Sequence, residues 1–197
     1  MSAPAREAGE IVLVRHAETE WSRDGRHTGR VDIPLTAAGR AAAGDLAVQL
    51  ARARYELVLC SPSLRARETC ELAGLSAGAH ADTDLLEWDY GDYEGLTTRE
   101  IQARRPGWSL WRDGCPGGET ATEVGARADR VIERLRGLHG GAVVFSHGHL
   151  LRVLGARWVQ LDAAEGARLG LSAGHLAVLG HERATAILAC WNAAALA

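Results

Sequence analysis

Three short apolar runs, each followed by a segment with helical periodicity, constrain the fold of this chain more than any other feature. The runs lie at residues 11–14, 57–60 and 142–145, and polar residues or glycines flank each of them. Continuous apolar runs of this length are typical of strands that are buried on both faces of a parallel sheet. Strands that alternate with helices predict an α/β fold, a three-layer αβα sandwich around a mostly parallel central sheet.

Capping residues indicate where the predicted helices begin. Thr36 is expected to cap a helix that runs to about residue 52. Ser61 and Pro62 predict the N-cap and first position of a second helix, which ends near residue 73. Capping boxes indicate the start of two more helices. One box is Thr97 with Glu100, and the other is Thr120 with Glu123, which begins a helix that runs to about residue 138. Residues 148–160 are expected to form the last helix.

The remaining segments complete one predicted domain that spans residues 1–197. Residues 176–179 and 186–189 are expected to form two closing strands, joined by a short turn near Gly180. Residues 84–116 lack clear periodicity and hold several tryptophans, which we expect to pack together. In an α/β domain such an insertion usually covers the active edge of the sheet.

The charged residues exclude several classes of protein. All 22 basic residues are arginines, so the chain has no lysine for Schiff-base or P-loop chemistry. The net charge of −3 argues against binding to nucleic acid or an anionic membrane surface. No apolar run is long enough to span a membrane, and the first ten residues do not resemble a secretion signal.

The four cysteines lack the spacing of a zinc site, and we interpret them as free thiols. Free thiols favour a reducing, cytoplasmic location. We also expect no metal ion and no cofactor.

Reactive side chains gather where the predicted strands end. Arg15 and His16 follow the first strand, His147 and Gly148 follow the third, and Arg65 lies early in the helix after the second. Because ligands bind at the carboxyl ends of parallel strands, these residues are expected to share one site. Arginines and a helix N-terminus suit a phosphate group, and imidazole is a nucleophile or acid near neutral pH.

Six blocks along the chain carry a family resemblance. The first is LVRHAETEW at residues 13–21, and the others lie at residues 29–39, 61–69, 86–95, 117–120 and 146–148. In this order they resemble the motifs of the histidine phosphatase, or phosphoglycerate mutase-like, superfamily. The resemblance covers about residues 11–190. It is greatest to acid phosphatases of the actinobacterial type and to sugar phosphatases similar to sedoheptulose-1,7-bisphosphatase.

The resemblance implies a role for each reactive residue. His16 would be the nucleophile that takes the phosphoryl group and becomes phosphohistidine. Arg15, Arg65 and His147 would bind the phosphoryl oxygens and stabilise the charge that develops during transfer. Glu87 would protonate the leaving oxygen and then deprotonate the water that cleaves phosphohistidine.

Further residues are expected to bind the substrate, and some of them differ from the family pattern. Ser22 stands where many members have Asn, and Thr28 where many have Gln or Ser, so both are candidate hydrogen-bond donors. Gly29, Tyr90 and Gly148 complete this set. Ala17 replaces the usual glycine after the histidine, which narrows the phosphate cradle slightly.

Four more polar residues lie close to the motifs. His27 is expected near the mouth of the pocket, because it precedes Thr28. His149 could touch the substrate or cap its helix, and we favour the cap. Arg127 and Arg152 are expected to hold helices and loops rather than to contact substrate.

Within the superfamily we favour a metal-independent phosphatase that acts on small phosphate esters, above all sugar phosphates or bisphosphates. Mutases of the family have a longer, more basic insertion than this chain has. A phosphoglycerate mutase, a phosphoprotein phosphatase and a non-catalytic phosphate-binding module remain as alternatives. The resemblance leaves the oligomeric state open, with a homodimer among the states that the family contains.

Overall fold

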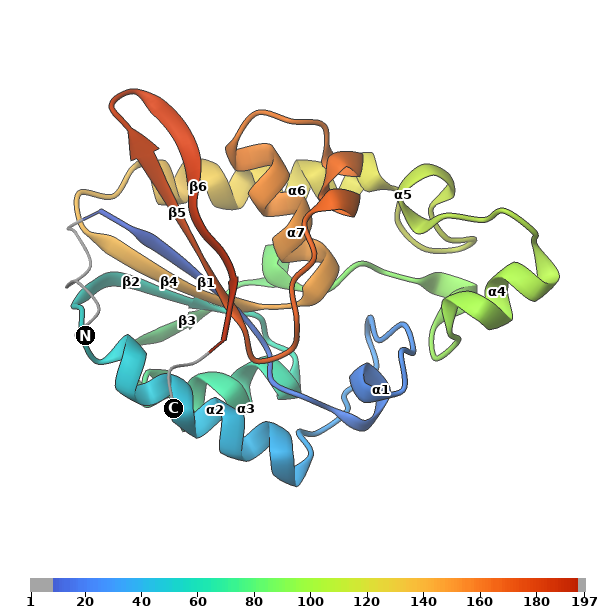
Figure 1. Ribbon diagram of the computed structural model, residues 1–197, viewed down its shortest axis with the longest axis horizontal. Coiled ribbons are helices and arrows are strands. Elements are labelled where there is room, and N and C mark those ends of the chain that lie inside the picture. The colour runs from blue at the N-terminus through green and yellow to red at the C-terminus, as the bar shows by residue number, and fades with distance from the viewer. Residues whose placement is uncertain (1–8, 195–197) are drawn as a thin grey trace.

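A six-stranded sheet runs through the centre of the protein in the computed structural model, which describes residues 9–194 (Figure 1). The strand order is β3-β2-β4-β1-β5-β6. Four neighbouring strands are parallel, namely β3 (Ala79–Ala81), β2 (Tyr55–Cys60), β4 (Gly141–Ser146) and β1 (Ile11–Arg15). The last two, β5 (Leu176–Glu182) and β6 (Thr185–Ala193), are antiparallel to their neighbours. The sheet is therefore mostly parallel, as the sequence predicts.

Helices cover both faces of the sheet, which confirms the predicted three layers. Helices α2 (Ala37–Leu50) and α3 (Leu64–Leu72) lie below it in Figure 1, and α6 (Ala121–Arg136) and α7 (Gly148–Trp158) lie above. Alternate side chains of β1 point to the two layers. Val12 and Val14 belong to the core with α2 and α3, whereas Ile11 and Leu13 belong to the core with α6 and α7.

Three of the predicted helix caps are confirmed, and one is wrong. The hydroxyls of Thr36, Thr97 and Thr120 each accept a backbone N–H three residues later. Helix α3, however, begins at Leu64 with Ser63 as N-cap. Ser61 lies three residues before the first helical residue, and its N–H donates to the carbonyl of Phe145, 2.9 Å away, which continues the strand pairing.

The turn between the last two strands lies later than predicted. Gly180 is inside β5, where it pairs with Ile187 of β6. Pairing continues to Glu182 and Thr185, so the turn consists of two residues, 183 and 184. Tight hairpin turns need a positive φ, and Arg183 supplies it with a φ of 58°.

The insertion between residues 84 and 116 lies beyond the carboxyl ends of β1 and β4 (Figure 1). It contains η3 (Gly91–Tyr93), α4 (Thr98–Arg104) and α5 (Leu110–Asp113). Trp88 and Trp108 are buried in the core that this segment shares with α6 and α7, and Trp111 packs against it. The tryptophans thus hold the insertion in place, as expected. The shorter elements are α1 (Glu20–Arg23), η1 (Ser76–Gly78), η2 (Thr83–Leu85) and η4 (Ala163–Arg168).

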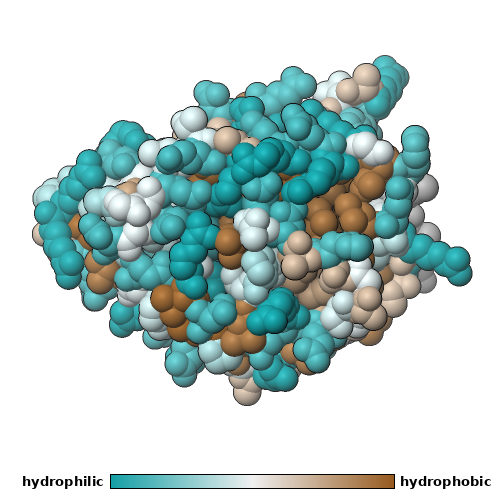
Figure 2. Space-filling model, turned by 180° about the vertical axis from the view of Figure 1, so that it is seen from behind, coloured by the Kyte–Doolittle hydropathy of each residue, from teal (hydrophilic) through white to brown (hydrophobic). Residues whose placement is uncertain are grey.

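Hydrophilic side chains cover most of the face shown in Figure 2, with hydrophobic patches between them. Among residues 9–194, the exposed large hydrophobic residues are Val31, Val48 and Leu161. Within residues 9–194, no helix combines the length and the apolar character that a membrane crossing requires.

Candidate active site

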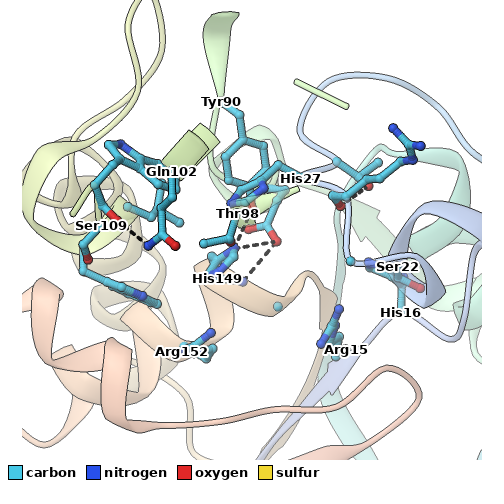
Figure 3. A pocket seen from close by; sticks show the side chains of 18 residues that line it. Arg15, His16, Ser22, His27, Tyr90, Thr98, Gln102, Ser109, His149 and Arg152 are labelled. Carbon is cyan, nitrogen blue, oxygen red and sulfur yellow. Dashed lines mark hydrogen bonds and ion pairs between the residues drawn. The ribbon is translucent and has the colours of Figure 1, made fainter. Parts of the chain in front are cut away.

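A pocket of about 330 Å³ opens where β1 and β4 end. The two strands are in register at Arg15 and Ser146, so the residues that follow them, His16 and His147, emerge side by side. The wall is formed by the end of β1, the start of α7, the segment of residues 22–28 and the insertion (Figure 3). The sequence predicts the site at this edge, and the structure shows a pocket there.

His16 has one ring nitrogen held and the other free. Its Nδ1 lies 2.8 Å from the carbonyl oxygen of Ala17. A carbonyl only accepts, so Nδ1 carries the proton and Nε2 has the lone pair. Burial, together with the positive charges of Arg65 and Arg15, holds the pKa of His16 well below its ordinary value. The ring is therefore neutral and nucleophilic at Nε2.

Arg15 and the start of α7 form an anion-binding corner beside His16. Nη1 of Arg15 donates to the carbonyl of Leu171, at 2.5 Å, while its buried Nε has no partner within residues 9–194. Gly148 is the first residue of α7, and an added Cβ there would lie 3.0 Å from Cζ of Arg15. A guanidinium and a helix N-terminus that meet in this way suit a phosphate group.

Arg65 and His147 lie behind His16 and are not on the pocket wall. Arg65 is fully buried, and its Nε donates to Nδ1 of His147 at 3.1 Å. Its terminal nitrogens donate to the carbonyls of Thr28, Gly29 and Val31. Because these carbonyls occupy the guanidinium, its effect on the site in this structure is electrostatic. That it contacts phosphoryl oxygens stays a prediction.

The hydrogen bonds of His147 fix its tautomer. Nδ1 accepts from Arg65, so Nε2 carries the proton and donates to Oγ of Ser61, 2.8 Å away. Burial and the nearby Arg65 hold the pKa of His147 well below its ordinary value. The two histidine rings meet edge to face, with centroids 5.3 Å apart. A neutral His147 therefore leaves Arg65 and Arg15 as the positive charges beside His16.

Glu87 lines the pocket and is held by backbone N–H groups. Its Oε1 accepts from Trp88 and Leu150, each at 2.9 Å, and its Oε2 accepts from His149 at 3.0 Å. Arg127 fixes the chain around it, because the guanidinium donates to three backbone carbonyls, those of Asp84, Leu86 and Glu87. The predicted role of Arg127 in holding a loop is confirmed.

The predicted substrate-binding residues divide into two groups. Ser22, Thr28, Tyr90 and Gly148 line the pocket. Gly29 does not line it, and that it contacts the substrate stays a prediction. Its N–H donates to Oε1 of Glu94 at 2.8 Å, and an added Cβ would lie 2.8 Å from the carbonyl oxygen of Trp88. Glycine is needed at this position because the loop packs closely against the insertion.

His149 and Arg152 reach the pocket, contrary to our expectation for both. The N-cap of α7 is His147, so the predicted cap at His149 is wrong. Nδ1 of His149 lies 2.6 Å from the hydroxyl of Tyr90. Arg152 does hold η4, through the carbonyls of residues 166 and 167, but it also stacks over the ring of Trp111 and lines the pocket.

Other wall residues have no signal in the sequence. Arg26, Thr98, Gln102 and Ser109 line the pocket, and none of them belongs to a reactive motif. Only the expected position of the insertion could have indicated the last three. His27, predicted at the pocket mouth, does line it.

No group of three or more His, Cys, Asp and Glu side chains within residues 9–194 is arranged to hold a metal ion.

Comparison with known proteins places this geometry in a family. The sequence pattern of the histidine phosphatase superfamily (branch 1) matches residues 11–194. An acid phosphatase of Mycobacterium tuberculosis is 43% identical, over 91% of this chain and 90% of its own length. Sedoheptulose 1,7-bisphosphatase of Saccharomyces cerevisiae is 39% identical, over 76% of this chain and 67% of its own.

A solved structure agrees with the sequence matches. The product of an open reading frame from Mycobacterium tuberculosis superimposes with a TM-score of 0.90 at 38% identity, and the match covers 95% of this chain and 98% of that one. The pattern match spans nearly all the described residues and includes both histidines of the pocket edge. The chain therefore belongs to the histidine phosphatase superfamily, branch 1.

Proposed function

We propose that this protein hydrolyses phosphate monoesters of small sugars through a phosphohistidine at His16, without a metal ion. The observation that carries the proposal is the neutral His16 ring, whose Nε2 is free while Nδ1–H is held by Ala17. The names of the relatives support the substrate class, since one is an acid phosphatase and another a sugar bisphosphatase.

In the first step, Nε2 of His16 attacks phosphorus and the bond from phosphorus to the alcohol oxygen breaks. The positive charge that forms on the imidazole is stabilised by the carbonyl of Ala17, which accepts Nδ1–H. Arg15 and the N-terminus of α7 stabilise the phosphoryl oxygens. Glu87, in its protonated form, gives its proton to the departing alcohol oxygen.

In the second step, Glu87 acts in the opposite sense. A water molecule attacks phosphorus, Glu87 takes its proton, and the bond from phosphorus to Nε2 breaks. Inorganic phosphate leaves, and His16 returns to its neutral form. The three backbone N–H groups that hold Glu87 keep the carboxyl in one place for both proton transfers.

The test is phosphate release from sugar mono- and bisphosphates, 3-phosphoglycerate, nucleotides and an aryl phosphate. His16→Ala is the control, and it is expected to abolish both turnover and the acid-labile phosphoenzyme. Near-normal turnover by His16→Ala would show that another group is the nucleophile. Transfer of the phosphoryl group between substrate oxygens, with little free phosphate, would favour a mutase.

The proposal that the reaction needs no metal ion has its own test. EDTA is expected to leave the rate of phosphate release unchanged. Loss of activity that a divalent cation restores would contradict this part of the proposal.

A further inference from the structure

The two ends of the pocket differ in chemistry. Figure 3 shows Arg15, His16 and Ser22 at one side, and Gln102 and Ser109 at the other. The insertion contributes residues of α4, of α5 and of the segment between them to the second end, and all of their side chains are uncharged. They are Thr98, Gln102, Trp108, Ser109, Leu110 and Trp111. The end away from His16 is thus suited to the uncharged part of a phosphate ester.

His27 presents a fixed hydrogen-bond acceptor to this space. Its Nδ1 lies 2.8 Å from the carbonyl oxygen of Leu96, so Nδ1 carries the proton and Nε2 has the lone pair. Burial lowers the pKa of His27, which keeps the ring neutral. Rings on several sides fix its orientation, with Tyr90 at 4.8 Å, Trp108 at 5.8 Å and His149 at 6.1 Å between centroids.

Gln102 presents a second acceptor. Its Nε2 donates to the carbonyl oxygen of Trp108 at 2.9 Å, so the amide group has one orientation and its Oε1 faces away from that bond. Trp108 is itself fixed, because its indole N–H donates to the carbonyl of Gly114 at 2.9 Å. His27 and Gln102 come from separate segments, and both are held against the same Trp108.

Two fixed acceptors among the uncharged side chains that the insertion contributes are complementary to hydroxyl groups, which can donate a hydrogen bond to each. We infer that His27 and Gln102 form a hydroxyl-binding subsite, which selects phosphate esters of polyols and sugars over esters of plain alcohols. This inference rests on the proposed function, since it concerns the leaving group of the same reaction. It assigns specificity to residues outside the motifs of phosphoryl transfer.

The test compares two esters with the same six-carbon chain, sorbitol 6-phosphate and n-hexyl phosphate. The measured quantity is the ratio of their kcat/KM values, because the ratio cancels any change in the shared phosphoryl chemistry. Loss of one hydrogen bond to a substrate hydroxyl corresponds to about a tenfold change in rate. His27→Asn keeps a donor near the position of Nδ1 but loses the acceptor at Nε2, and is expected to lower the ratio about tenfold.

Matched variants separate this effect from general damage. His27→Gln places an amide oxygen near the position of Nε2 and is expected to keep most of the ratio. Gln102→Met is expected to lower the ratio, whereas Arg104→Ala, at the exposed end of α4, keeps the ratio of the wild type. A ratio that is the same in His27→Asn, Gln102→Met and the wild type would overturn the inference.

Failure of the proposed function and failure of the hydroxyl subsite give different experimental results. If the wild type hydrolyses neither ester and also leaves an aryl phosphate intact, the protein is not a phosphatase of this kind. If it hydrolyses the aryl phosphate and both esters but the variants do not change the ratio, the phosphatase function stands and the hydroxyl subsite does not.

Discussion

Mild acid is expected to destabilise this protein through its two buried active-site histidines. His16 and His147 are 4% and 0% exposed, and burial with neighbouring arginines holds both pKa values well below the ordinary one. In the unfolded chain each ring binds a proton near its ordinary pKa of about 6.5. The unfolded state therefore binds more protons below this pH, and the free energy of unfolding falls as the pH falls.

The expected size follows from the number of protons. Each ring that stays neutral in the folded protein lowers the free energy of unfolding by about 1.4 kcal/mol for every pH unit below 6.5. His16 and His147 alone give a loss of about 3 kcal/mol between pH 7.5 and 5.5, and His27 and His149, whose pKa values burial also lowers, add to it. For a chain of this size, that loss corresponds to a fall in Tm of about 6 to 12 °C.

Urea unfolding at a series of pH values, followed by circular dichroism, measures this loss. His147→Asn, whose side-chain oxygen can still accept from Arg65, is expected to reduce the pH dependence by about one proton. His80→Asn, at an exposed position in β3, is expected to leave it as in the wild type. A free energy of unfolding that stays constant from pH 7.5 to 5.5 would refute the reasoning.

Three further perturbations have defined outcomes. Glu87→Gln is expected to lower the rate of hydrolysis of alkyl phosphates about a hundredfold and that of aryl phosphates much less, because only poor leaving groups need a proton. Equal losses of kcat for both kinds of ester would argue against Glu87 as the general acid. Arg127→Leu is expected to lower the free energy of unfolding in urea by about 3 kcal/mol, because three carbonyls lose this donor and the half-buried Glu119 carboxylate loses its charged partner and keeps only the N–H of Asp89. The exposed Arg130→Leu is expected to have little effect on this free energy. Gly148→Ala is expected to weaken inhibition by inorganic phosphate, because the new Cβ crowds the Arg15 guanidinium; inhibition as strong as in the wild type would show that the guanidinium can shift without loss.

The strands and the reactive edge could be predicted from the sequence because their signals are local. Apolar runs identify β1, β2 and β4, and the carboxyl ends of parallel strands meet at one edge, so His16 and His147 had to be neighbours. The motif blocks then indicated Glu87, which lines the pocket as expected. Threonine caps were also predictable, because a cap bonds its own helix within three residues.

The predictions that failed depend on partners far away in the chain. Ser61 is a residue type that often caps helices, but its N–H donates to the carbonyl of Phe145, 84 positions later. The surroundings of Arg65 could not be predicted either, because the carbonyls that surround its guanidinium belong to residues 28, 29 and 31, a distant segment of the chain. The position of His149 depends on Tyr90 and the aromatic residues of the insertion. Local sequence does not reveal such contacts.

The two halves of the insertion are connected to the catalytic end in different ways, and this difference bears on how new specificities can arise. Glu94, in the first half, holds the loop at Gly29 whose carbonyls fix Arg65. The side-chain hydrogen bonds of Gln102 and Trp108, in the second half, end inside the insertion. Exchange of pocket-lining side chains such as Gln102 on α4 can therefore change which alcohol the pocket accepts without breaking a hydrogen bond to the catalytic end.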